Sequence, residues 1–279
     1  MSFFKIIRPF NCLFVALTVI FGAYYKSSDF FYYPVFFAVL SAFLIAAGGY
    51  VINDFFDYKI DIINKPKRIL PSGRMKPRTA LTFAILLLAT GIFSSFFTTN
   101  YFCILIVVVN SLVLFFYAKI FKKKFLVGNF IVSWAAASTF LFGGLSNNNL
   151  QNSLIITIFA FLYTFARELI KDAEDIEGDS RLGATTMAVK LGIKKTVQTA
   201  FFPIILIIFF ILLLFLKQKL SLQTFLLLNL IGSFPLIFFT ILLWKSSTQK
   251  NLSKISFWMK IDMLILLFVF GLGNNYENL

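Results

Sequence analysis

The chain of 279 residues contains no histidine and only two cysteines. The lack of histidine excludes haem ligation by imidazole, histidine-based acid–base catalysis and the common zinc sites. Cys12 and Cys103 lie in separate apolar segments, so the sequence offers no Cys-x-x-Cys motif, and two small buried side chains are the simpler interpretation. The chemistry of this protein must therefore depend on other side chains.

Acidic residues are also scarce, since 12 Asp and Glu stand against 26 Lys and Arg and leave a net charge of +14. Charged residues make up 14% of the chain and apolar residues 59%, whereas an ordinary soluble domain is about a quarter charged. A mean hydropathy of +0.86 leaves too little polar surface to coat a soluble globule. The composition excludes a soluble enzyme, a disordered chain and a disulfide scaffold, and it predicts an all-α integral membrane protein.

Long apolar runs recur along the whole chain. A transmembrane helix needs roughly 20 mostly apolar residues. Nine stretches qualify as candidates, at about residues 10–27, 33–53, 79–98, 101–118, 126–146, 151–170, 196–216, 220–244 and 256–273. The first resembles a signal peptide, because Lys5 and Arg8 precede it, but further apolar runs follow and we expect it to stay attached as a span.

The basic residues predict how these spans are oriented. Nine spans place the two termini on opposite sides, and 23 of the 26 Lys and Arg then share the side of the N-terminus. Only Lys26, Lys217 and Lys219 fall on the other side. By the positive-inside rule, the N-terminus and the charged connections are expected on the cytoplasmic side of the cell membrane. The positive charge is thus a sign of topology and does not indicate nucleic acid binding.

Nine of the twelve acids lie in two places, after the second candidate span and around the end of the sixth. Each place carries three aspartates separated by three and four residues. These are Asp54, Asp57 and Asp61, and Asp172, Asp175 and Asp179. On one helix such positions share a face, so each set predicts a row of three carboxylates. The offset of four spans predicts two four-helix pseudo-repeats, about 1–125 and 126–244, with an extra helix at 256–273.

Three like charges on one face repel one another, so a positive group normally lies among them. Carboxylate oxygens suit Mg²⁺, which keeps several waters and bridges to phosphate oxygens. Basic residues stand near both sets, and metal-binding acids beside phosphate-binding bases are the pattern expected for a diphosphate substrate. A single Asp-x-x-Asp would be explained better as solvated loop charge. Two matched sets in a chain poor in acids favour a Mg²⁺ site, in which the sets could face each other and hold two or more ions.

Two stretches resemble the signatures of the UbiA family of intramembrane prenyltransferases. NDFFDYKIDIINKPKRILPSGR, from Asn53 to Arg74, is similar to the first signature, and RELIKDAEDIEGDSRLGATTMAVKLG, from Arg167 to Gly192, is similar to the second. RPFN at residues 8–11 and GN at residues 128–129 also fit. The resemblance implies nine transmembrane helices around a central cavity, which is the count that the apolar runs gave.

The resemblance and the carboxylate chemistry together predict Mg²⁺-dependent transfer of a prenyl group from a polyprenyl diphosphate, with release of diphosphate. Within the family, PSGR and the second motif look most like members that add a geranylgeranyl chain to the hydroxyl of a prenylated glycerol phosphate. One alternative is an aromatic acceptor of quinone, tocopherol or chlorophyll-type biosynthesis. Another is a transporter of divalent cations or metabolites, but transporter sites usually lie at mid-membrane, whereas these acids lie at helix ends.

The resemblance also assigns expected roles to single residues. Asp54, Asp57, Asp172 and Asp175 are expected to hold Mg²⁺, with Asp61 and Asp179 completing the catalytic set. The residues expected to bind diphosphate are Asn53, Arg68, Arg74, Arg167, Lys171 and Arg181, together with Lys119 or Lys122. The family's tyrosine and lysine near the end of the fourth helix are matched only loosely, by Tyr117 followed by these two lysines. Asn11 is a further expected site residue, and membrane lipid is the expected surrounding.

Overall fold

The computed structural model describes residues 2–272, and every regular element in that range is a helix. This confirms the predicted all-α class. Seven helical segments are long and apolar enough to cross a membrane. They are α3 (Tyr32–Phe56), α5 with η1 (Pro77–Thr98), α6 (Tyr101–Lys119), α7 (Val127–Ser146), α8 (Leu150–Glu174), α10 (Met187–Leu216) and the segment from α11 to α12 (Leu222–Lys245).

The two other predicted spans correspond to α2 (Pro9–Tyr24) and α13 (Gln249–Leu272). The apolar helix α2 has only 16 residues, and α13 carries several charged side chains. Neither belongs to the seven, so the count of nine stays a prediction. The short elements are α1 (Ser2–Ile6), α4 (Tyr58–Asn64), η1 (Phe96–Thr98), η2 (Phe121–Lys123), α9 (Ile176–Arg181), α11 (Leu222–Leu227) and the π-helical turn η3 (Leu228–Ser233), which precedes α12 (Phe234–Lys245).

The seventh predicted span begins too late. The sequence placed it at residues 196–216, whereas α10 begins at Met187. Three lysines lie among the first nine residues of α10, so a prediction from hydropathy alone left these residues out of the span. The added segment contains a break at Gly192, whose φ of 81° and ψ of 162° are not helical.

Large apolar side chains are exposed along the long helices. Phe36 of α3, Phe209 of α10 and Phe268 of α13 are 61%, 55% and 73% exposed. In water such faces would be costly, whereas in lipid they are not. The exposed rings therefore agree with a protein that lies in a bilayer.

The chain divides into two compact units. Unit 1 consists of the chain up to Lys122 together with Ala135–Thr157, and unit 2 consists of Lys123–Trp134 together with the chain from Ile158 onward. The boundary at residue 122 lies close to the predicted repeat boundary at residue 125, but α7 and α8 each contribute to both units. The predicted pseudo-repeat stays a prediction.

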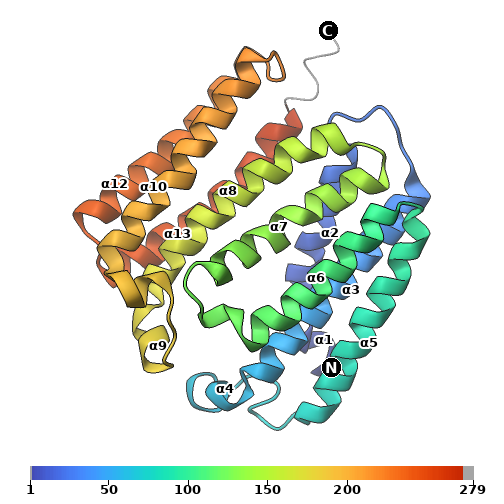
Figure 1. Ribbon diagram of the computed structural model, residues 1–279, viewed down its shortest axis with the longest axis vertical. Helices are drawn as coiled ribbons and strands as arrows, with labels where there is room; N and C mark the ends of the chain where they lie inside the picture. Colours follow the sequence, from blue (N-terminus) through green and yellow to red (C-terminus); the bar gives the residue numbers. More distant parts are fainter. Residues whose placement is uncertain (1, 273–279) are drawn as a thin grey trace. The chain divides into compact units, whose positions relative to one another are not determined.

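Unit 1 is built around α3, which packs against α2, α5 and α6. Figure 1 shows α3 and α5 running side by side. Val51 and Ile52 of α3 and Ala80 and Ala84 of α5 share a buried apolar cluster at the end of α3 that leads to α4. This cluster supports the part of unit 1 that carries the first aspartate set.

Helix α2 touches the second half of α7 backbone to backbone. A Cβ atom on Gly143 would lie 1.9 Å from the carbonyl oxygen of Val19, and one on Gly22 would lie 2.1 Å from that of Phe140. Small residues allow such close approach of membrane helices. Only glycine fits at these two positions.

Unit 2 contains a buried polar pair that joins α8 to α13. The Tyr163 hydroxyl lies 2.6 Å from Oδ2 of Asp262 and 3.0 Å from the carbonyl oxygen of Met259. Tyr163 is fully buried and Asp262 nearly so. A carboxyl group within a membrane helix normally needs such a partner, and this one explains how the last helix tolerates Asp262.

We expect Tyr163→Phe to lower the free energy of unfolding by about 1–3 kcal/mol, because it leaves the buried carboxyl of Asp262 without its hydroxyl partner. The measurement is the thermal unfolding midpoint of the purified protein in detergent. The matched control is Tyr101→Phe, since Tyr101 is 88% exposed. Equal midpoints for the two variants would contradict a stabilising role of the pair.

Candidate functional site

Both aspartate sets lie where a long helix gives way to a short one. In each set the first aspartate is in the last turn of the long helix, the second joins the two helices and the third is in the short helix. The first set follows α3 into α4, and the second follows α8 into α9. The joining residues have almost the same backbone angles: φ −79°, ψ −5° at Asp57 and φ −88°, ψ 4° at Asp175.

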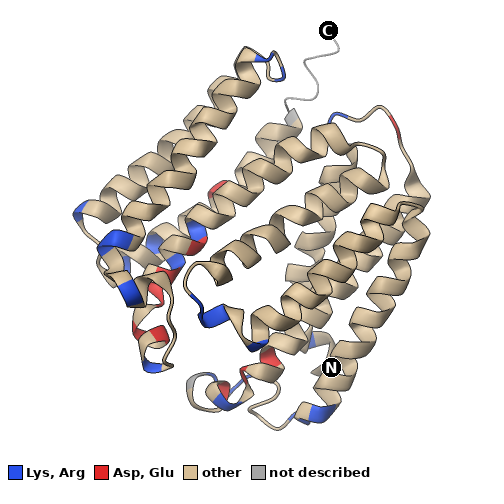
Figure 2. Cartoon of the chain, viewed as in Figure 1, with Lys and Arg blue, Asp and Glu red and all other residues tan. Residues whose placement is uncertain are grey.

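The aspartates of each set therefore do not lie on one continuous helix, as the spacing predicted. Both sets instead run from a long helix through a junction residue into a short helix. Figure 2 shows that in each unit many of the charged residues gather near this junction. The shared break supports the inference that the equal spacing has one structural cause.

In the first set, Arg68 bridges two carboxylates. Its Nη1 lies 2.6 Å from Oδ2 of Asp61 and 3.3 Å from Oδ1 of Asp54. Both aspartates are buried. Because burying an unpaired carboxylate is costly, this guanidinium stabilises the two charges and keeps them close together.

The middle carboxylate of the first set has its own partners. Asp57 Oδ2 accepts hydrogen bonds from Nζ of Lys122 at 2.6 Å and from Nδ2 of Asn53 at 3.1 Å. Lys119 instead lies over the ring of Phe115, with Nζ 5.9 Å from the ring centroid. The sequence left Lys119 and Lys122 as alternatives, and the structure brings Lys122 to the carboxylates.

Sequence reasoning missed Arg8 as a member of this site. Its Nη2 lies 2.5 Å from Oδ1 of Asp54, and its guanidinium lies 5.1 Å from the ring centroid of Tyr50. Arg8 has a φ of 54°, in the left-handed region, directly before α2 begins at Pro9. The RPFN motif at residues 8–11 begins with Arg8, so the motif could have indicated this residue. Asn11, the residue of this motif that was predicted, has its side chain near the Tyr50 hydroxyl.

Arg74 stabilises the loop that holds Arg68. Its Nη2 donates to the carbonyl oxygen of Lys67 at 2.6 Å, and its Nε donates to Oγ of Ser72 at 2.8 Å. The guanidinium is thus used within the loop, and a contact of Arg74 with diphosphate stays a prediction.

We expect Lys122→Gln to reduce kcat/KM by about tenfold or more, because it removes one charge-assisted hydrogen bond from the site. Lys119→Gln serves as the matched control, since it removes the same charge from a residue that contacts only a ring. The measurement is the initial rate, for each purified variant, of the prenyl transfer that the sequence resemblance implies. A larger loss of kcat/KM for Lys119→Gln than for Lys122→Gln would mean that Lys119, and not Lys122, acts in the site.

In the second set, the carboxyl group of Asp172 is partly buried. The side chain of Asn129 of α7 lies near its carboxyl group, and its Oδ2 is buried with no hydrogen-bond partner among residues 2–272. Partial burial raises the pKa of the neighbouring Asp175 carboxyl, while the positive charge of Lys171 opposes this shift. Asn129 belongs to the GN pair noticed in the sequence, but its contact with Asp172 was not predicted.

The bases of the second set are arranged differently from those of the first. Arg167 Nη1 pairs with Oε1 of Glu168 at 2.7 Å, and its Nε is buried without a partner in the described part of the chain. Lys171 and Arg181 are exposed. Arg167 and Lys171 lie on α8 and Arg181 lies on α9, and contact of these three bases with a ligand stays a prediction.

The loop after α9 is attached to the segment between α6 and α7. The backbone N–H and the hydroxyl of Thr185 both donate to the carbonyl oxygen of Lys123, at 2.8 and 3.0 Å. Met187 and Ala188, just beyond the loop, are buried. These contacts hold the segment that follows α9 in place.

The donor set is all oxygen, which suits a hard cation such as Mg²⁺. The unpartnered buried Oδ2 of Asp172 fits a metal ligand, since such an atom otherwise has no compensation. In the first set the carboxylates are paired with Arg8, Arg68 and Lys122 instead. Among residues 2–272, no three acidic or sulfur-bearing side chains already form a metal-binding cluster.

Comparison with known proteins gives three concordant findings. The UbiA prenyltransferase family matches residues 13–261. The digeranylgeranylglyceryl phosphate synthase of Methanocaldococcus jannaschii is 38% identical over 277 residues, which cover 98% of this chain and 95% of that protein. A solved structure of a digeranylgeranylglyceryl phosphate synthase has a TM-score of 0.86 at 34% identity and covers 98% of this chain and 97% of its own.

A second solved structure shares the fold at lower sequence identity. It is a UbiA homologue from Archaeoglobus fulgidus bound to DMAPP and Mg²⁺, with a TM-score of 0.72 and 16% identity, covering 96% of this chain and all of that one. At this identity the similarity establishes the common fold.

Proposed function

Because this chain belongs to the UbiA prenyltransferase family, we propose that it transfers a geranylgeranyl group from its diphosphate to the hydroxyl of a prenylated glycerol phosphate. The chain is an integral membrane protein, with seven apolar helices of spanning length within residues 2–272. The observation that carries the proposal is the pair of matched helix–junction–helix aspartate sets, in a chain similar along 98% of its length to a digeranylgeranylglyceryl phosphate synthase.

Under this proposal, Asp54 and Asp57 of the first set and Asp172 and Asp175 of the second hold Mg²⁺. When bound, the metal neutralises the charge that develops on the leaving diphosphate as the allylic C–O bond breaks. Mg²⁺ together with a prenyl diphosphate is also the ligand pair of a UbiA homologue with this fold. The carboxylate oxygens of these aspartates are ligands of the type that Mg²⁺ prefers.

The bases of the first set are already positioned to bind the diphosphate. Arg68 lies 2.6 Å from Asp61, and Lys122 lies 2.6 Å from Asp57, so a phosphate bound through these carboxylates is within reach of both cations. Charge-assisted hydrogen bonds from guanidinium and ammonium groups to phosphate are among the strong ones. Arg68 and Lys122 thus orient the donor and stabilise the leaving group.

The acceptor hydroxyl attacks the allylic carbon and loses its proton. A carboxylate that does not hold the metal suits this step, and Asp61 and Asp179 are the two candidates in the sets. Exposed aromatic rings on the long helices face lipid, so we assign no ring to stabilisation of the allylic cation. We also propose that both aspartate sets lie on the cytoplasmic side, since 23 of 26 basic residues share that side in the predicted topology.

The test is an acceptor assay with the purified protein in lipid and labelled geranylgeranyl diphosphate. We expect label to pass to geranylgeranylglyceryl phosphate and not to 4-hydroxybenzoate. Transfer to the aromatic acid alone would replace the proposed acceptor by an aromatic one. Mg²⁺ flux that needs no prenyl diphosphate, with no transfer to either acceptor, would support a transporter instead.

A further inference from the structure

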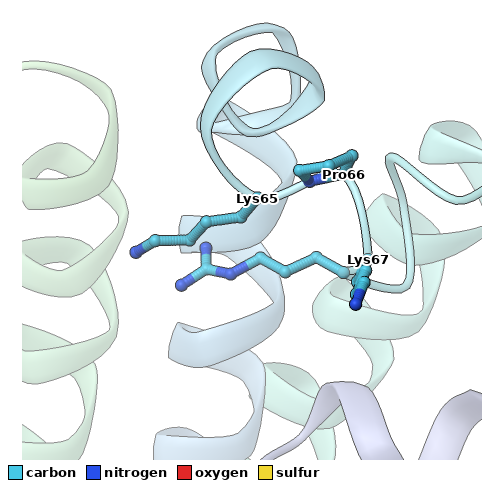
Figure 3. A pocket seen from close by; sticks show the side chains of 4 residues that line it. Lys65, Pro66 and Lys67 are labelled. Carbon is cyan, nitrogen blue, oxygen red and sulfur yellow. The ribbon is translucent and has the colours of Figure 1, made fainter.

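The loop after the first aspartate set carries a surface pocket, and of its lining residues only Arg68 has a role in the proposed function. The pocket has a volume of about 450 Å³ and is lined by four consecutive residues, Lys65, Pro66, Lys67 and Arg68. Figure 3 shows the side chains of Lys65 and Lys67 leaving the loop in different directions, with Pro66 between them. A pocket with three cationic side chains and no acid in its lining suits an anionic ligand.

The two lysines of this pocket are not neutralised by the protein. Both are exposed, and within residues 2–272 neither ammonium group has an ion pair or a side-chain hydrogen bond. Arg8, Arg68 and Lys122 differ from them, since each of these is paired with an aspartate of the first set. The lysines therefore keep their full charge for a ligand.

The backbone of the pocket is held in place. Ile69 and Leu70, directly after it, are buried in the apolar cluster of unit 1. The Arg68 N–H donates to the carbonyl oxygen of Lys65 at 3.0 Å, and Arg74 donates to that of Lys67 at 2.6 Å. The backbone that carries the two lysines is thus held in place, which reduces the entropic cost of binding.

Arg68 connects this pocket to the carboxylates. It lines the pocket, and the same guanidinium bridges Asp54 and Asp61. Arg68 therefore belongs both to the lining of this pocket and to the first aspartate set.

We infer that this pocket binds the phosphate of the acceptor lipid, a phosphomonoester, and so determines acceptor class; the inference rests on the proposed function. Two anionic groups must then be bound together, the donor diphosphate and the acceptor phosphate. The donor is bound with Mg²⁺ at the carboxylates, whereas a phosphate without a metal needs cations that have no carboxylate partner. Lys65 and Lys67 meet that need.

The position of the pocket agrees with this role. A phosphomonoester carries close to two negative charges at neutral pH, so it must stay at the membrane surface while its prenyl chain lies in the bilayer. The loop follows the short helix α4, which comes directly after the end of the spanning helix α3, and a headgroup would lie at such a helix end. An aromatic acceptor without phosphate gains nothing from these lysines.

The experiment compares Lys65→Gln/Lys67→Gln with the charge-matched control Lys59→Gln/Lys76→Gln, whose residues are exposed lysines of the same unit outside the pocket. We expect the pocket variant to raise KM for geranylgeranylglyceryl phosphate by about tenfold or more, with KM for geranylgeranyl diphosphate unchanged. Glycerol phosphate should compete with the acceptor in the wild type and not in the pocket variant. An equal rise of KM in the control, or a rise for the donor instead, would overturn the inference.

A binding measurement separates failure of this inference from failure of the proposed function. Geranylgeranylglyceryl phosphate is titrated into lipid nanodiscs that contain either the wild type or the pocket variant, with no prenyl donor. If the wild type transfers nothing to this lipid, the proposed function fails, but weaker binding to the variant still supports a phosphomonoester pocket. Equal binding to both proteins would reject the pocket, as would equally effective competition by phosphatidylglycerol, a phosphodiester.

Discussion

Replacing Asp172 by Asn is expected to lower kcat/KM for prenyl transfer by at least about 10²-fold. The carboxyl and the amide have nearly the same shape, so the variant can fold, but an amide offers a metal neither the negative charge nor the second oxygen. The buried Oδ2 that lacks a partner in residues 2–272 is the atom concerned. We expect a similar loss for Asp54→Asn, whose carboxylate is held by Arg8 and Arg68.

The matched control for both variants is Asp29→Asn. Asp29 is an exposed acid in the connection between α2 and α3, and the hydrogen bonds found there use its backbone. Initial rates are compared at equal amounts of membrane-inserted protein. Normal turnover of Asp172→Asn or Asp54→Asn with intact insertion would contradict the assignment of these carboxylates to the metal.

Removal of divalent cations is expected to abolish transfer completely, and added Mg²⁺ is expected to restore it. Ca²⁺ should restore it poorly, because it favours more ligands at longer distances than Mg²⁺ does. The fold should survive the removal, since in the first set Arg8, Arg68 and Lys122 already neutralise the carboxylates. If Arg8, Arg68 and Lys122 were absent, the carboxylates of the first set would repel one another, and the fold would need the metal for its stability as well.

The measurement pairs the rate of transfer with the thermal unfolding midpoint of the same sample, each with and without EDTA. Activity should disappear while the midpoint changes little. Turnover that persists in excess chelator would remove the metal from the proposed mechanism. A large fall of the midpoint would mean that the basic residues do not replace the metal as counter-charges.

The local features of this molecule could be predicted from the sequence, because they depend on composition and short spacing. The apolar runs predicted the helices, and the repeated spacing of three and four residues located both aspartate sets. Helical periodicity could not predict the junction at Asp57 and Asp175, since the residue pattern suits a continuous helix as well as a broken one.

Contacts between distant parts of the chain could not be predicted. Arg8 and Asp54 are 46 positions apart, and Asp57 and Lys122 are 65 apart, so only the packing of α2, α3 and the end of α6 brings them together. The same packing separates the roles of Lys119 and Lys122, which are three residues apart. The sequence also did not predict that the Arg74 guanidinium hydrogen-bonds within its own loop; its expected contact with diphosphate stays a prediction.

The backbone contact between α2 and α7 has a consequence for the order in which this protein assembles. The first apolar helix, with 16 residues, is about 24 Å long, shorter than the roughly 30 Å core of a bilayer. The surface of α7 against which it packs at Gly143 is synthesised more than a hundred residues later. When α2 has been synthesised, the part of α7 that it packs against has therefore not yet been made. The packing of unit 1 can be completed only after more than half of the chain has been translated.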